Sequence, residues 1–271
     1  MLGRQKYIKF SVILVAILVS SWLVYLKITM NAYEDEIGRR SIAINNLYGV
    51  RIHYQYNRES FFPHQPSARG SQAWLKHVRS TLPLVQKFLS QYPPHVIRKT
   101  LSDIFLLATL EFNGQRYGGT YGGSAIYISI GSFFRYSDSP LLGLMHAEFS
   151  SILFHRYEFP RQEWQATNKP GWKYVGTGFD MLARNDSYDQ TPALLENGFL
   201  EGYSQASMEE DFNGLVQWAF AKPDRLSKLF VKYERIRKKY QLVIQFYKTV
   251  DPNIEIPGIT ADGETAEKFP Y

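Results

Sequence analysis

Cysteine is absent from the 271-residue sequence. Its absence excludes disulfide bonds, thiolate metal ligands, a cysteine nucleophile and a lipid-modified cysteine anchor. The fold must therefore be held by a hydrophobic core. The composition, 45% hydrophobic and 15% aromatic, is that of a globular protein. Internal repeats and low-complexity segments are also missing, so we expect one globular domain.

Acidic residues are missing from the N-terminal region, where none precedes Glu34. Three basic residues lie before an apolar run over 10–28, and they are Arg4, Lys6 and Lys9. At about 1.5 Å per residue this run nearly spans a hydrocarbon core of ~30 Å. The positive-inside bias predicts a cytoplasmic tail over 1–9, a transmembrane signal anchor over 10–28 and export of the remainder. A cleaved signal peptide is the alternative, although the run exceeds a typical apolar region of ~7–15 residues.

An excess of positive charge is lacking in the exported part. The net charge is +6, but four of the 31 Lys and Arg residues precede residue 32, leaving 27 against 25 acidic residues. We therefore expect no nucleic-acid partner. One basic run, 222–248, holds nine Lys and Arg residues and two acids. A solvated helix face explains this run best, and contact with anionic lipid or polysaccharide is the alternative.

Strand patterns come early in the exported part and helix patterns come late. After a polar linker over 29–48, we expect a globular domain over 49–271 of the α+β class. Two expected strands flank a glycine-rich loop, which suggests a hairpin. That loop lacks a Gly-Lys-Ser/Thr ending and leads into a strand, so a phosphate site is not expected. The predicted strands cover 49–56, 103–112 and 124–130, and the predicted helices cover 71–92, with a kink or break at Pro83, 140–157, 208–221 and a region ending near Lys248.

The predicted helix over 140–157 carries a histidine and a carboxylate, His146 and Glu148, in an apolar segment. A buried charge usually has a structural or functional reason. Three segments here resemble the zinc-binding metallopeptidases of bacterial envelopes, distant relatives of the catalytic domain of anthrax lethal factor. The segments are GGTYGGSAIYISI, HAEFSSIL and GFLEGYSQASMEEDFNGLVQWAF. The resemblance covers roughly 49–220 and implies a zincin-like fold, with a small sheet and hairpin followed by helices.

The family's active-site helix reads His-Glu-Phe-x-His-Ile-Leu, and its later helix contains Glu-Asp-Phe-Ala-Glu. The resemblance implies two zinc-binding histidines four residues apart, a glutamate that activates water and a third ligand on the later helix. The ligand positions correspond here to Ala147, Ser151 and Gly214, so all three expected ligands are replaced. The catalytic positions remain, with Glu148 as the implied general base and Tyr203 as the residue that steadies the oxyanion.

A rearranged zinc site is conceivable, with His146, His155 and Asp211 as candidate ligands beside Glu148 or the neighbouring Glu209 and Glu210. Helix geometry argues against the simplest versions. Residues 146 and 148 point to opposite sides at ~100° per residue, and residues 148 and 155 lie ~10 Å apart along the axis. Zinc is therefore possible but not favoured.

Ordinary structural roles are the alternative for each of these residues. The two histidines can be helix residues with satisfied hydrogen bonds. Glu148 can be a buried carboxylate paired with Tyr203 or a lysine. Tyr203 itself can be a core tyrosine with a bonded hydroxyl. The acids at 209–211 lie in a first helical turn, where the helix dipole favours negative charge.

Three functions follow from these observations. The first is a membrane-anchored envelope protein with a zinc-metallopeptidase-like domain, active or degenerate. The second is a catalytically dead module that binds a peptide or an envelope protein, and the third is a structural inner-membrane component. In each case we expect a single-pass protein of the bacterial inner membrane with its globular domain in the periplasm or outside.

Overall fold

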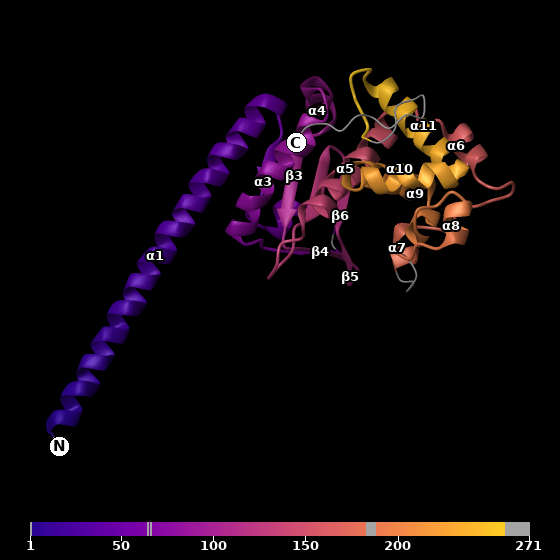
Figure 1. The fold of residues 1–271 in the computed structure, drawn as a ribbon. Coiled ribbons are helices and arrows are strands. Elements are labelled where there is room, and N and C mark those ends of the chain that lie inside the picture. Colours follow the sequence, from indigo (N-terminus) through magenta and orange to yellow (C-terminus); the bar gives the residue numbers. More distant parts are fainter. Residues whose placement is uncertain (1, 64, 66, 183–187, 258–271) are drawn as a thin grey trace.

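The computed structural model describes residues 2–63, 65, 67–182 and 188–257, with the side chains of the first helix from Val15 onward. A long helix leads into a small α+β body (Figure 1). The strands are β1 (Arg51–His53), β2 (Ala68–Ser71), β3 (Asp103–Leu107), β4 (Thr109–Phe112), β5 (Gln115–Tyr117), β6 (Gly119–Gly122) and β7 (Ala125–Ser129). The larger helices are α1 (Leu2–Tyr48), α3 (Leu75–Ser90), α5 (Asp138–Arg156), α9 (Met208–Ala221), α10 (Pro223–Lys232) and α11 (Glu234–Val250). The shorter helices are α2 (Arg58–Phe61), α4 (Pro94–Thr100), α6 (Arg161–Thr167), α7 (Gly178–Leu182), α8 (Pro192–Glu196) and the 3₁₀ helix η1 (Gly202–Gln205).

Helix α1 runs without interruption for 47 residues. It is long and apolar enough to cross a membrane, and its N-terminal part extends away from the body (Figure 1). The segment 29–48, expected to be a polar linker, is the C-terminal part of this helix. The segment has no proline, and Ile37, Ile44 and Tyr48 recur at helical spacing and are buried in the core beside α3. The predicted end of the globular domain, 258–271, lies outside the described residues.

The predicted helix over 71–92 is α3, which is shorter and continuous. Residues 68–71 instead form β2, and Pro83 lies inside α3 without dividing it. The apolar stripe of α3 is buried, and its members are Val78, Leu82, Val85, Phe88 and Leu89. Packing of this stripe compensates for the hydrogen bond that a proline removes from a helix.

The strands form two sheets, with orders β1-β3-β7-β6 and β2-β4-β5. The predicted strand over 103–112 is divided at Ala108, and its two halves belong to different sheets. The expected hairpin between this strand and 124–130 is wrong, because β3 and β7 pair in parallel. The hairpin that the resemblance implies in GGTYGGSAIYISI is present, because β6 and β7 pair antiparallel across a short turn. The glycine-rich segment itself supplies β5 and β6. These strands pair antiparallel with β4 and β7, and the intervening chain lets β7 return parallel to β3.

Helix α5 is the central buried helix, as predicted. Its apolar stripe is at most 1% exposed, and consists of Leu141, Met145, Phe149, Ile152 and Leu153. It packs closely on α9, where Gly143 allows the approach, since a Cβ there would lie 2.8 Å from the Cβ of Ala221. Helix α9 has its predicted bounds, and the Ser207 hydroxyl caps it by accepting the N–H of Glu210 at 3.1 Å.

Candidate functional site

Glu148 lies on the face of α5 that turns toward β6. Its side chain is partly buried and runs against the backbone of Gly119, where a Cβ would lie only 2.7 Å from the carboxylate oxygen Oε1. Glycine at this point of β6 therefore makes room for the carboxylate. Burial, and then the nearby carboxylates of Glu210 and Glu209, raise the pKa of Glu148 well above its ordinary value.

Glu209 and Glu210 lie in the first turn of α9, where the helix dipole favours carboxylates. The hydroxyl of Tyr203 on η1 donates to Oε1 of Glu210 at 2.9 Å. Burial raises the pKa of Glu210 to about 7, while the hydrogen bond from Tyr203 acts in the opposite direction. Oε2 of Glu209 lies 2.9 Å from Nε2 of the exposed His155. We call Glu148, Glu209 and Glu210 the acidic cluster.

Tyrosines surround the acidic cluster. Burial and the carboxylate of Glu209 raise the pKa of Tyr121, which lies on β6 with its ring stacked on His155 at 5.8 Å. Burial and Glu210 raise the pKa of Tyr203, whose ring stacks with Tyr188 at 6.2 Å. These phenols therefore stay neutral near pH 7 and act as hydrogen-bond donors to carboxylates.

The three expected zinc-ligand positions lie at the interface between α5 and α9. The Ser151 hydroxyl accepts a hydrogen bond from Nδ2 of Asn213 at 2.7 Å, and Ser150 donates to Oδ1 of the same amide at 2.6 Å. Ala147 is buried, and a Cβ on Gly214 would lie 3.1 Å from Oγ of Ser204. Neutral side chains therefore occupy this interface and satisfy one another.

These residues do not fit a zinc ion. Zinc in proteins is held by at least three nitrogen, sulfur or carboxylate ligands within about 2.0–2.3 Å. Alanine, serine and glycine offer no such ligands, and within the described part of the chain no three His, Asp or Glu side chains are placed to hold a metal.

His146 faces the opposite side of α5 from Glu148, as the helix geometry predicts. Its Nδ1 lies 2.6 Å from the hydroxyl of Tyr92, and its ring stacks on Phe220 with centroids 3.4 Å apart. Burial lowers the pKa of His146 well below its ordinary value, so the ring is neutral. The structure thus places this candidate ligand inside the aromatic core.

Asp211 also lies apart from the acidic cluster, in a buried network. Its Oδ2 accepts from Nζ of Lys239 at 2.6 Å, from the hydroxyl of Tyr174 at 2.7 Å and from Nε1 of Trp164 at 3.0 Å. Lys239 also donates to the carbonyl of Gly198 at 3.0 Å. The expectation of a solvated face for the basic run is therefore wrong at Lys239, which is fully buried.

The structure thus brings Glu148 and Tyr203 together with Glu209 and Glu210, and His155 borders them. Sequence reasoning missed the position of Tyr121 beside Glu209 and the burial of Lys239. A signal for the lysine existed in α11, because position 239 lies in the stripe formed by the buried Ile236, Tyr240 and Val243.

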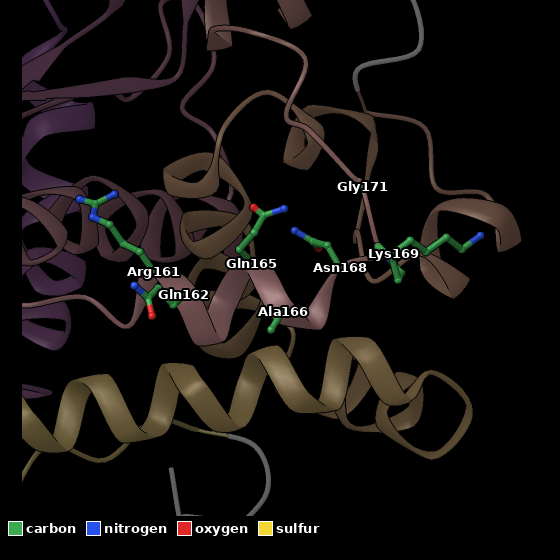
Figure 2. Close-up of a pocket in the computed structure, with 8 residues that line it drawn as sticks. Arg161, Gln162, Gln165, Ala166, Asn168, Lys169 and Gly171 are labelled. Atoms are coloured by element: carbon green, nitrogen blue, oxygen red, sulfur yellow. The ribbon is translucent and has the colours of Figure 1, made fainter.

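A surface pocket lies along α6 and the turn that follows it (Figure 2). Five of its eight lining residues have polar side chains, and Arg161, Gln165, Asn168 and Lys169 are among those drawn as sticks. None of the predicted site residues lines it. This pocket therefore adds no group to the candidate site.

Comparison with known proteins points to the fold alone. No family model and no curated protein matches the sequence. The structure is similar to that of a Bacteroides caccae protein described as a putative zinc-binding metallo-peptidase, with a TM-score of 0.55 and 16% identity. The match covers 80% of this chain and 86% of that one. The chain therefore has a metallopeptidase-like fold, preceded by one helix that is long and apolar enough to span a membrane.

Proposed function

We propose that this chain is a single-pass protein of the bacterial inner membrane whose metallopeptidase-like periplasmic domain binds a cationic peptide segment without hydrolysing it through zinc. The observation that carries the proposal is the hydrogen bond that Asn213 donates to Ser151. Ser151 and Ala147 occupy two of the positions where the resembling family has its zinc ligands. The fold is kept, and the zinc chemistry is replaced by packing.

The anchor is supported by the apolar run in α1 and by the charges around it. The run over 10–28 has basic residues on its N-terminal side and no acidic residue before Glu34. Such an arrangement favours a cytoplasmic N-terminus and an exported domain. The side chains along the run from Val15 onward do not contact the body, since they are largely exposed.

The peptide-binding role is supported by an edge strand beside the acidic cluster. β6 pairs with β7 on one side and lies at the edge of its sheet, so the other side can pair with an extended peptide. Gly119 of this strand touches Glu148, and Tyr121 lies beside Glu209. A peptide added to β6 would pass the carboxylates, which favour a lysine, an arginine or a free amino terminus.

Zinc content of the purified full-length chain tests the loss of metal chemistry. After incubation with zinc and removal of excess, we expect substoichiometric zinc in the wild type by mass spectrometry. The triple variant Ala147→His, Ser151→His, Gly214→Glu should retain measurable zinc, because it restores two imidazoles on one helix face and a third ligand on α9. Replacing Ser150 instead of Ser151 gives a matched control, whose second imidazole points off that face.

Near-stoichiometric zinc in the wild type would contradict the proposal, above all if zinc persisted in the His155→Ala variant.

Peptide binding is tested separately by fluorescence anisotropy with a labelled extended peptide containing lysines. We expect the double variant Glu148→Gln, Glu210→Gln to bind it about tenfold more weakly, a loss of about 1.4 kcal/mol. Equal affinity for a peptide with glutamates in place of the lysines would refute the charge argument.

A further inference from the structure

Helices α1 and α3 lie side by side and run in the same direction. The guanidinium of Arg79 reaches Oε2 of Glu36 at 3.3 Å and covers the ring of Tyr33 at 4.5 Å. Further along, Arg40 donates to Oε1 of Gln86 at 3.3 Å. Residue numbers rise together along both helices. The N-terminal end of α3 therefore faces the membrane-spanning part of α1.

The level of this end along α1 follows from the helical rise. Trp74 is the N-cap of α3 and precedes Arg79 by five residues, or about 7.5 Å. Because Arg79 is level with 33–36, Trp74 is level with about 28–31 on α1. The apolar run ends at Ile28. The N-terminus of α3 thus lies at the depth where the hydrocarbon core would give way to headgroups.

Four aromatic side chains are exposed here, and we call them the aromatic patch. They are Trp74, Phe133, Phe134 and Tyr136, with exposed fractions of 46%, 73%, 86% and 52%. The rings of Trp74 and Phe133 meet edge to face at 6.0 Å, so α3 and the loop after β7 form one surface. The exposed Lys76 holds its ammonium group 4.5 Å from the Trp74 ring.

The loop that presents the two phenylalanines is a closed turn. Gly131 has φ of +98°, and a Cβ there would lie 2.1 Å from the carbonyl oxygen of Phe134. The N–H of Tyr136 donates to the carbonyl of Ile130 at 3.0 Å. Only glycine fits at position 131. The backbone of this turn therefore holds Phe133 and Phe134 at the surface.

We propose that the aromatic patch rests in the interface of the same bilayer that α1 crosses and gives the domain a second membrane contact. The inference rests on the proposed anchor. Aromatic rings favour the headgroup level, where an apolar body and a polar edge are both accommodated. Lys76 adds attraction to anionic lipid phosphates. The patch is thus continuous with the membrane surface that α1 already defines.

The absence of cysteine permits a direct test on the full-length chain in proteoliposomes. Single variants Phe134→Cys, Leu18→Cys and Val231→Cys are each labelled with a nitroxide, and its collisions with oxygen and with a water-soluble nickel complex are measured. Position 18 is an exposed residue of the apolar run, and position 231 is 90% exposed on α10. We expect the ratio of oxygen to nickel collisions at position 134 to exceed that at position 231 about twofold or more, as at a lipid interface.

A ratio at position 134 equal to that at position 231, with position 18 still in lipid, would overturn the membrane contact and leave the anchor intact. Water exposure at positions 18 and 134 together would overturn the anchor and this inference with it. Spin–spin broadening at position 134 in place of lipid exposure would show that a second copy covers the patch, which also contradicts the proposal. Phe133→Ser provides the matched variant, since it should lower the ratio at position 134.

Discussion

Replacing Glu210 by glutamine should stabilise the protein at alkaline pH and have a much smaller effect at acidic pH. Glutamine keeps the size of the side chain and an oxygen that accepts the hydrogen bond from Tyr203. It removes only the charge, which burial and, to a smaller extent, the neighbouring Glu209 both disfavour. The substitution therefore isolates the free energy of holding a carboxylate in the acidic cluster.

The magnitude follows from the pKa of Glu210 in the folded and unfolded chain. Its ordinary pKa is 4.5, and folding raises it to about 7. The folded chain thus binds more protons at Glu210 between these values, so the contribution of this group to stability is fully present below pH 4.5 and is lost as the pH rises through about 7. At about 1.36 kcal/mol per pKa unit the full difference is about 3 kcal/mol. Partial solvent contact lowers this, and we expect about 1–2 kcal/mol at pH 8.

Urea unfolding of the full-length chain in nanodiscs, followed by tryptophan fluorescence, measures this difference at pH 5 and pH 8. We expect the variant to exceed the wild type clearly at pH 8 and to approach it at pH 5. Glu196→Gln, at an exposed carboxyl on α8, serves as the control and should show no such pH dependence. A variant of Glu210 that is less stable than the wild type at pH 8 would refute the reasoning.

Three further outcomes are expected. Lys239→Met should cost about 3–5 kcal/mol in urea unfolding, because it leaves the buried charge of Asp211 unpaired, and adding Asp211→Asn should recover part of the loss. Ile44→Ala should cost about 2–4 kcal/mol in the same assay, because this residue is 1% exposed in the core, and no loss would show that the end of α1 is not docked. The affinity for a lysine-containing peptide, measured by anisotropy, should rise between pH 6 and pH 8 as the raised pKa of Glu210, about 7, is passed, and an affinity that falls over this range would contradict the binding proposal.

The helices at the candidate site could be predicted from the sequence because local signals and burial agree there. The stripe from Leu141 to Leu153 has helical spacing and lies in the core. The bounds of α9 follow from its cap at Ser207 and the break at Pro223. The opposite directions of His146 and Glu148 follow from helix geometry alone.

The strand pairing and the route of the chain could not be predicted in this way, because they depend on contacts distant in sequence. Nothing local shows that the strand over 103–112 divides between two sheets, or that β7 pairs in parallel with β3. The helical state of 29–48 depends on the docking of Ile37 and Ile44 against α3. Likewise, the proximity of Glu148 to Glu210 requires the packing of α5 on α9.

Helix α1 is continuous from its apolar part to its docked end, so it joins the two rigidly. A flexible tether would let the body sample a wide volume and turn freely, whereas a docked helix would transmit every tilt of the proposed membrane-spanning segment to the body. From residue 28 to residue 48 the rise is about 30 Å, so the proposed anchor would hold each part of the body at a set level between the bilayer surface and about 30 Å above it. The edge strand β6 would then meet only those targets that are displayed at its own level, so position would limit the targets in addition to charge.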